Sequence, residues 1–206
     1  MCMRILAATA MLAAASTVPA ISQEAGAAPD VTVAGPDQAA ERPIGAATFL
    51  DADGETIGPA NLRDTPHGVV IRITIKGLEP GEKAVHIHEN GECDPAGGFE
   101  SAGGHFNPSG ARHGYLAPEG PHAGDLPNQW VTEDGVLEAT VLSPMTALVT
   151  GEQENPGEGR FVIASSTENT AIVVHEGADD YASDPAGHAG GRIACGVIEL
   201  APPFGG

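Results

Sequence analysis

Short stretches of alternating apolar and polar residues run through most of the chain and predict β-strands. The clearest is VVIRITI at residues 69–75, in which an aliphatic residue at every second position faces one side of a strand. Similar patterns predict further strands at 46–50, 55–62, 84–88, 135–142, 147–150, 161–165, 170–175 and 193–200. No stretch keeps a helical period for more than about two turns, which is too short for a stable isolated helix.

Turn signals and two long loops separate these strands. The sequence DADG at residues 51–54 predicts a hairpin turn. The glycine-rich segments 89–129 and 176–192 are far longer than ordinary connections, and loops of that length inside a compact domain are usually functional. About eight short strands with two such loops predict an all-β antiparallel sandwich or barrel.

Composition agrees with a strand-rich fold and limits the partners. The chain has 206 residues with 28 glycines and 17 prolines, and only 4% of its residues are aromatic. This composition favours a turn-rich fold over a helical bundle. The formal net charge of −19 would repel nucleic acids and anionic membranes, so we expect neither as a partner.

The N-terminus has the features of an export signal. Arg4 precedes an apolar run at 5–15 that is too short to span a bilayer, and small residues around Ala20 suit a signal peptidase. A retained membrane anchor is the alternative, whereas a lipoprotein is disfavoured because Cys2 precedes the apolar run. We therefore predict a periplasmic or secreted protein with three parts: a signal peptide at 1–20, a flexible acidic leader at 21–41 and a folded domain at 42–206.

Export also bears on the three cysteines. Cys2 would be removed with the signal peptide, which leaves Cys93 and Cys195. Two cysteines in an oxidising compartment tend to pair, so the sequence predicts a disulfide between them.

Six of the eight histidines occur at spacings that suit metal ligands. His86 and His88 form an H-x-H pair on a predicted strand, where the period of two places both imidazoles on one face. Alone, an H-x-H pair is weak evidence for a metal site. His175 ends the predicted strand 170–175 and can meet the pair across the sheet. Three or four imidazoles in a roughly planar set suit copper(II).

The long loop at 89–129 carries a more specific set. Its members are three histidines and one carboxylate, a combination that zinc binds in a tetrahedron: His105, His113, His122 and Asp125. The glycines and prolines between them let the loop curl around a metal, and the metal would in turn order the loop. The alternative is a disordered polar loop with chance histidines.

At these positions the chain resembles a known family. The segments HIHENGEC, SAGGHFNPSG, RHGY, HAGDL, VVHEGADDY and GGRIACGVI resemble Cu/Zn superoxide dismutases of the bacterial periplasmic type, in order and in spacing. The resemblance extends from about Thr48 to Leu200. It implies an eight-stranded antiparallel Greek-key barrel or sandwich with two long functional loops. It also implies superoxide as the substrate, and it leaves open whether the protein is a homodimer or a monomer.

The resemblance assigns ligands residue by residue. Copper would be bound by His86, His88, His105 and His175, and zinc by His105, His113, His122 and Asp125. His105 would thus serve both metals as a bridging imidazolate. Asp179 resembles the aspartate that links a copper-bound histidine to a zinc-bound one and fixes the orientation of both rings; the alternative is an exposed loop acid. Cys93 and Cys195 match the disulfide of the family.

The implied activity is dismutation of superoxide to oxygen and hydrogen peroxide by one-electron cycling of copper, with His105 delivering a proton. Arg192 is expected to attract the anion, because a guanidinium stays charged and donates in a fork that suits a small oxyanion. The alternative is a surface arginine that stiffens the loop. The 176–192 loop has no lysine, and it has Ala186 where animal relatives have threonine. We therefore expect its steering of the substrate to differ from theirs.

Three alternative functions share parts of this pattern. A non-catalytic relative that binds or delivers copper typically lacks a copper ligand or the channel arginine, and a copper-only member lacks the zinc ligands. A sandwich-fold adhesion module has no reason to collect these residues. The copper ligands, the zinc ligands and the channel arginine are all present here, which favours the dismutase. His67 and His188 match no ligand position and are expected to face solvent.

Overall fold

In the central strands, every second side chain points toward one apolar core, as the sequence pattern predicts. In β3 (Gly68–Lys76) the residues Val69, Ile71, Ile73 and Ile75 are completely buried. The computed structural model describes residues 44–150, 156–165 and 167–200. The other strands in these ranges are β1 (Ile44–Asp51), β2 (Thr56–Thr65), β4 (Gly81–Lys83), β5 (Val85–His88), β6 (Gln129–Val131), β7 (Val136–Ser143), β8 (Thr146–Leu148), β9 (Phe161–Ala164), β10 (Ala171–His175), β11 (Arg192–Val197) and β12 (Glu199–Leu200).

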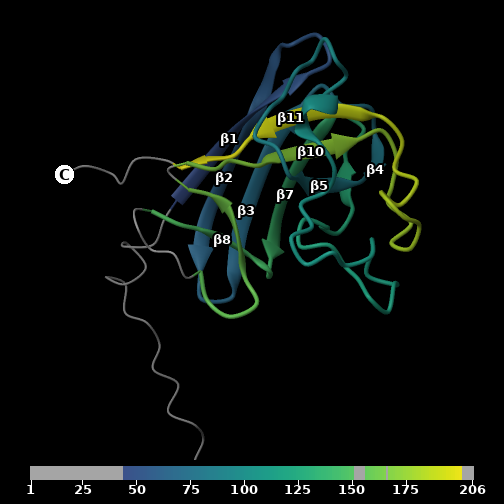
Figure 1. The fold of residues 1–206 in the computed structure, drawn as a ribbon. Coiled ribbons are helices and arrows are strands. Elements are labelled where there is room, and N and C mark those ends of the chain that lie inside the picture. The colour runs from purple at the N-terminus through teal and green to yellow at the C-terminus, as the bar shows by residue number, and fades with distance from the viewer. Residues whose placement is uncertain (1–43, 151–155, 166, 201–206) are drawn as a thin grey trace, which may run out of the picture. The chain divides into compact units, whose positions relative to one another are not determined.

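The main sheet curls into a nearly closed antiparallel barrel (Figure 1). Its strands follow the order β4-β6-β7-β3-β2-β1-β11-β10-β5, and β12 pairs with β1. β4 and β5 lie at the two ends of this order but follow each other in the chain, separated only by Ala84. The all-β antiparallel fold is therefore confirmed.

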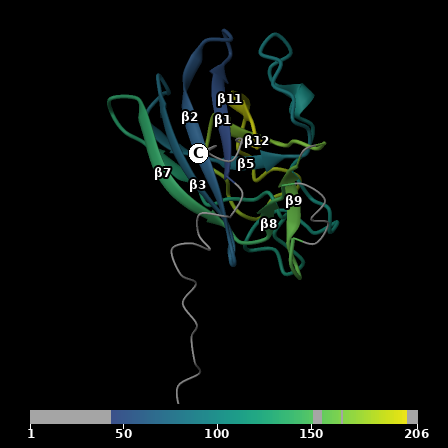
Figure 2. The same cartoon turned by 90° about the vertical axis from the view of Figure 1, so that its left-hand side faces the viewer.

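Two short strands were not predicted by the pattern, one predicted strand is divided in two, and one pair differs in direction. β4 lies between the predicted strands 69–75 and 84–88, β6 begins at the last residue of the predicted 89–129 loop, and the predicted strand 193–200 is divided into β11 and β12. β8 and β9 pair with each other in parallel, as a separate two-stranded sheet (Figure 2). Alternation within a strand predicts which face is buried, but it does not predict the partner or its direction.

A second, smaller apolar cluster anchors the 89–129 loop on the outside of the barrel. It contains Phe99 and Ala102 of the loop together with Val173 of β10 and Cys195 of β11, all completely buried. Cys93 packs against this cluster and forms a disulfide with Cys195, with an S–S distance of 1.99 Å. The predicted pairing of the two cysteines is confirmed.

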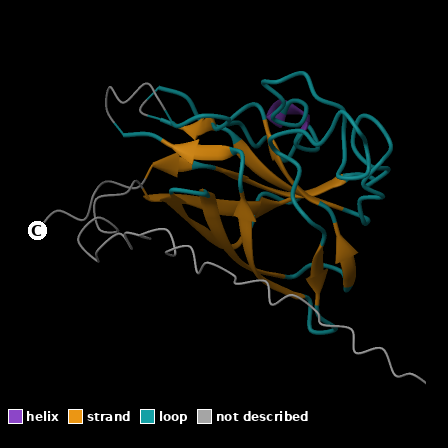
Figure 3. Cartoon of the chain, turned by 90° about the horizontal axis from the view of Figure 1, so that it is seen from below, coloured by secondary structure: helices purple, strands orange, loops and turns teal. Residues whose placement is uncertain are grey.

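The two long loops gather on one side of the barrel, away from the two-stranded sheet (Figures 1 and 3). They contain the only helix of the described ranges, a 3₁₀ turn η1 at Glu100–Ala102. None of the described helices is long and apolar enough to cross a bilayer. The predicted signal peptide and leader lie outside the described residues.

The core position of Phe49 gives a test of this packing. Phe49 is completely buried in the main core, so Phe49→Ala should lower the free energy of unfolding by about 3–5 kcal/mol. Leu142→Ala is the matched control, because Leu142 is 47% exposed on β7; its cost should stay within about 0.5 kcal/mol. Urea unfolding in the presence of a chelator measures both variants without a contribution from bound metal. Equal losses in the two variants would contradict the assignment of this core.

Candidate metal centre

β5 presents two histidines on the outer face of the barrel. Val85 and Ile87 belong to the inner core, so the alternation turns His86 and His88 outward, where the 89–129 loop buries both almost completely. β10 pairs with β5 through Val173 opposite His86. His175 follows two residues later on the same outer face and is 3% exposed.

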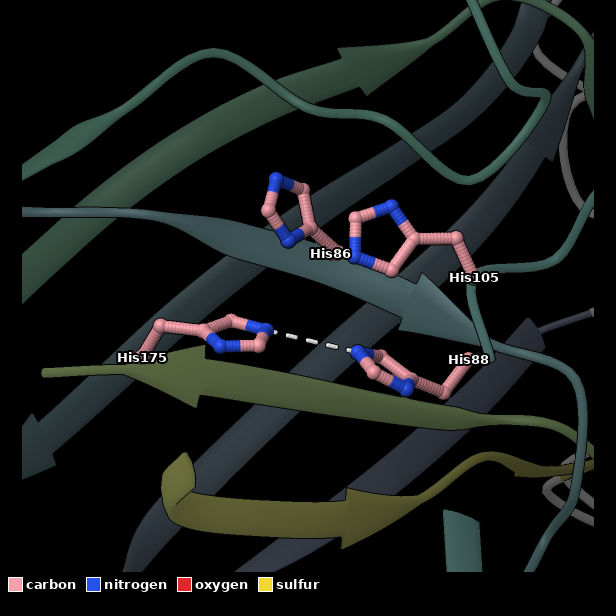
Figure 4. A group of neighbouring side chains, drawn as sticks. All are labelled: His86, His88, His105 and His175. Carbon is pink, nitrogen blue, oxygen red and sulfur yellow. Dashed lines mark hydrogen bonds between the residues drawn. The ribbon is translucent and has the colours of Figure 1, made fainter. Parts of the chain in front are cut away.

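A fourth imidazole reaches this group from the 89–129 loop. The backbone of His105 forms a bridge with that of His88, and the ring centroid of His105 lies 4.0 Å from that of His86. Figure 4 shows the four rings converging from β5, β10 and the loop. Each offers a nitrogen, and these nitrogens all lie within 4.8 Å of one another. The structure thus brings together the four predicted copper ligands.

Hydrogen bonds on the far side of each ring leave one nitrogen facing this group. The Nε2 atom of His86 donates to Asp179. The Nδ1 atoms of His88 and His175 donate to backbone carbonyls of Gly103 and Gly190. A neutral imidazole that donates through one nitrogen keeps a lone pair on the other, so these contacts set each ring for metal binding. The inward Nε2 atoms of His88 and His175 are 3.4 Å apart.

A second donor group meets around Asp125. Its Oδ1 atom lies 2.9 Å from Nδ1 of His105, 3.2 Å from Nδ1 of His113 and 3.3 Å from Nδ1 of His122. The Nδ1 atoms of His105 and His122 are 3.4 Å apart. A tetrahedral zinc ion with bonds of about 2.0 Å requires donor separations of about 3.3 Å. These four separations therefore fit a zinc ion.

The second oxygen of Asp125 is used by the protein itself. Oδ2 accepts hydrogen bonds from the backbone N–H groups of Gly114 and His122 at 2.9 and 3.0 Å. Burial alone would raise the pKa of Asp125, but hydrogen bonds from the surrounding histidines and the Gly114 amide hold it well below its usual range. The carboxylate therefore stays ionised and directs Oδ1 toward the zinc group.

Two buried nitrogens lack any hydrogen-bond partner within the part of the chain that the structure describes. They are Nδ1 of His86 and Nε2 of His105, both in the copper group. Leaving buried polar atoms unpaired costs free energy, which a bound metal would recover. His105 belongs to both groups, with Nδ1 beside Asp125 and Nε2 among the copper donors. The residues present therefore fit both metals.

Asp179 joins the two groups from the 176–192 loop. Its Oδ2 accepts a hydrogen bond from Nε2 of His86 at 2.8 Å, and its Oδ1 accepts one from Nε2 of His113 at 2.9 Å. Burial would raise the pKa of Asp179, but the bonds from His113 and His86 hold it well below its usual range. A Cβ atom at Gly187 would lie 1.8 Å from Oδ1 of Asp179, so only glycine fits there.

Sequence reasoning missed the residue that holds Asp179. The side chain of Asn128 accepts a hydrogen bond from the Asp179 amide and donates one to its carbonyl, both at 2.9 Å. The backbone N–H of Asn128 in turn donates to the hydroxyl of Tyr181 at 2.8 Å. The proximity of Asn128 to Asp125 in the sequence was the only available signal, because the contact joins segments about fifty residues apart.

Lys83 is a second missed residue. This buried lysine donates from Nζ to the carbonyl of Glu176, the residue after His175, at 2.7 Å. The backbone N–H of the neighbouring Ala84 donates to the carbonyl of Gly177, and the carbonyl of Ala84 accepts from the backbone N–H of His175. Lys83 therefore helps to anchor the start of the 176–192 loop beside a copper-group histidine.

Arg192 lies next to the copper group without joining either donor set. Its NH1 atom donates to the carbonyl of Phe99 at 2.6 Å, and NH2 donates to that of Gly103 at 2.8 Å. The same Gly103 carbonyl accepts from His88. The side chain is 15% exposed, so the guanidinium is fixed by carbonyls but remains within reach of solvent.

The imidazoles differ in their affinity for protons. Burial, followed by repulsion from neighbouring histidines, lowers the pKa of three copper-group rings: His88 to about 2, His105 to about 4 and His175 to about 3. Burial also acts to lower the pKa of His113, but hydrogen bonds to Asp125 and Asp179 outweigh it and raise the pKa to about 9.

His67 and His188 lie outside both donor groups. His67 is exposed in the turn between β2 and β3. The side chain of His188 is 80% exposed, with Nδ1 3.0 Å from Oδ2 of Asp180. The prediction that both face solvent is confirmed.

The sequence matches one family along most of the described barrel. Residues 56–198 match the family described as copper/zinc superoxide dismutase. The chain is 50% identical over 153 residues to Superoxide dismutase [Cu-Zn] 2 of Aquifex aeolicus, covering 74% of this chain and 84% of the relative. It is 38% identical over 148 residues to Superoxide dismutase [Cu-Zn] of Caulobacter vibrioides, covering 71% and 80%.

Solved structures agree with this assignment. A double mutant of a SOD-like protein from Bacillus subtilis aligns with a TM-score of 0.65 at 38% identity, over 74% of this chain and 95% of the other. Cu/Zn superoxide dismutase from Brucella abortus aligns with a TM-score of 0.56 at 28% identity, over 75% and 98%. The chain therefore belongs to the copper/zinc superoxide dismutase family.

Proposed function

We propose that this protein converts two superoxide anions and two protons into oxygen and hydrogen peroxide, using copper and zinc. Copper would be held by His86, His88, His105 and His175, and zinc by His105, His113, His122 and Asp125. One observation carries the proposal: the ring of His105 has one nitrogen in each of two complete donor groups. A protein that only stores copper has no need of a ring shared in this way.

The residues around the shared ring have separate roles. Bound copper would supply the one-electron redox chemistry that zinc cannot. Asp125 keeps the ring of His105 in place through Nδ1. The Nε2 atom of His105 is buried and has no protein partner among the described residues, so it can hold a proton beside the reacting oxygen. Asp179 keeps the rings of His86 and His113 in fixed orientations.

Arg192 would receive the anion. Its guanidinium lies beside the carbonyl that also orients His88, so an anion bound there is held close to the copper group. The net charge of −19 opposes approach from a distance. However, the Debye length is about 8–10 Å at ordinary salt, so Arg192 and copper dominate the field near the site.

We also propose that the protein acts in the periplasm or outside the cell. The support is the apolar N-terminal run, which suits a signal peptide, together with the Cys93–Cys195 disulfide, which requires an oxidising compartment.

A copper-binding or copper-delivery relative without catalysis is the second candidate. A SOD-like protein is among the solved structures similar to this chain. The complete donor groups and Arg192 favour the enzyme, and measured turnover separates the two functions.

The purified mature protein should contain about one copper and one zinc per chain, because each donor group fits one ion. It should remove superoxide in a pulse-radiolysis or cytochrome c competition assay. Removal of copper should abolish the activity, whereas removal of zinc alone should leave copper bound. Metal-replete protein without turnover would rule out the dismutase and favour copper delivery.

The His175→Ala variant should separate the two metals. His175 belongs to the copper group alone, so the variant should lose copper-dependent turnover by at least about 100-fold while retaining one zinc per chain. His188→Ala is the matched control, because it removes an exposed histidine from the 176–192 loop that follows His175, and it should keep both metals and full activity. Loss of both metals from His175→Ala would show that the two groups are assigned wrongly.

The metal-free protein should be most stable near pH 6.5. The lowered pKa values of His105 and His175 make the unfolded chain bind more protons below pH 6.5, so stability should fall as the pH drops from about 6.5 to about 4. The pKa of His113, raised to about 9, makes the folded chain bind the extra proton, so its contribution is lost as the pH rises from 6.5 through 9.

Urea unfolding in chelator between pH 4 and pH 9 measures this profile. Zinc displaces the proton at His113, so zinc-loaded protein should not show the loss of stability between pH 7 and pH 9. Metal-free stability that is constant across this alkaline range would contradict the raised pKa of His113.

A further inference from the structure

An acidic side chain lies directly beside the anion-binding arginine. Glu100 begins the 3₁₀ turn η1, and its Oε2 atom is 3.6 Å from NH2 of Arg192. The glutamate side chain is 78% exposed, whereas that of Arg192 is 15% exposed. An exposed carboxylate therefore lies beside a mostly buried guanidinium.

The backbone keeps this pair together. The two carbonyls that bind Arg192 belong to Phe99 and Gly103, which flank η1 on either side. The guanidinium is thus bonded to the same short segment that carries Glu100. The loop cannot move Glu100 away from Arg192 without breaking these hydrogen bonds.

The remaining donors of Arg192 point to a competition. NH1 and NH2 each donate to one carbonyl, and each nitrogen carries a second N–H group. The separation of 3.6 Å places Glu100 just beyond hydrogen-bond distance from NH2. A small rotation of this exposed side chain would let its carboxylate accept the N–H group that an incoming anion needs.

We propose that Glu100 determines the rate of anion capture, as a built-in competitor for the guanidinium of Arg192. This inference rests on the proposed function. Glu100 occupies the N–H groups of Arg192 for part of the time, so an incoming superoxide must displace its carboxylate. Other small anions that reach copper through the same site meet the same barrier.

The effect differs from that of the net charge. A charge in contact with Arg192 acts within a few ångströms, where salt screens weakly, whereas an acid more than about 10 Å away is largely screened at ordinary salt. The mechanism predicts that removal of this one charge matters more than removal of an equal charge on the far side of the fold.

Glu100→Gln should raise kcat/KM for superoxide by about threefold to tenfold at low ionic strength, because capture of the anion becomes easier. The gain should persist as salt is added, because salt screens weakly at the 3.6 Å separation of the two side chains. Glu133→Gln is the control with the same change in net charge; it lies in the turn between β6 and β7 and should change kcat/KM by less than about 1.5-fold. In an Arg192→Gln background, Glu100→Gln should give no gain, as a double-mutant cycle requires.

A second measurement does not depend on turnover. Azide is a small anion that binds copper(II) and changes its visible absorption, so its dissociation constant can be titrated on the copper- and zinc-loaded protein. Glu100→Gln should lower this constant severalfold, and Glu133→Gln should leave it unchanged. The guanidinium is needed for this difference, so Arg192→Gln should remove it.

The outcomes separate this inference from the proposed function. If Glu100→Gln matches Glu133→Gln in both kcat/KM and azide affinity, the role of Glu100 is wrong while the dismutase stands. If the same gain persists in the Arg192→Gln background, competition for the guanidinium is wrong. Metal-loaded wild-type protein without turnover would overturn the dismutase, and the azide titration would still decide the role of Glu100.

Discussion

The binding of the 89–129 loop to the free edge of β5 is the constraint on which both donor groups depend. β5 ends the strand order of the barrel, so its outer edge needs partners. The loop supplies them: the amide of Ile87 donates to Gly124, the amide of Phe106 donates to Ile87, and the amide of Glu89 donates to Gly104. Any side chain at position 124 would meet the carbonyl of Ile87 at 2.3 Å, so glycine allows this close approach. With the loop in this register, His105 faces His88 and Asp125 faces His86.

The 176–192 loop extends this arrangement without supplying a zinc ligand. Asp179 bonds one ring from each donor group, and Asn128 fixes the backbone of Asp179 from the 89–129 loop. A side chain that must satisfy two rings at once tolerates little displacement, which explains why Gly187 packs against it without room for a Cβ atom. The orientation of the copper-group rings is therefore set by contacts that lie outside the copper group.

The sequence predicted what depends on local pattern and on ligand chemistry. The alternation in β3 gave its buried face, and the spacing of His105, His113, His122 and Asp125 identified a group that the structure brings together. It could not predict contacts between distant segments, such as Lys83 with Glu176, Asn128 with Asp179, or Glu100 with Arg192. β4 and β6 were also missed, because strands of three residues are too short to show a period. The parallel pairing of β8 and β9 depends on where the chain returns, which alternation does not encode.

A net charge of −19 should repel an anionic substrate. This apparent conflict is resolved by the distances over which the charges act. Long-range repulsion is screened within about 10 Å, so capture is decided by the charges that touch the last part of the path. There, Arg192 is held by two carbonyls that leave N–H groups for an anion, and Glu100 lies beside it. The donor groups depend on the loop at β5, whereas the capture of anions depends on Arg192 and the charge beside it. Affinity for metal and rate of capture can therefore change independently, because they depend on different contacts of the same loop.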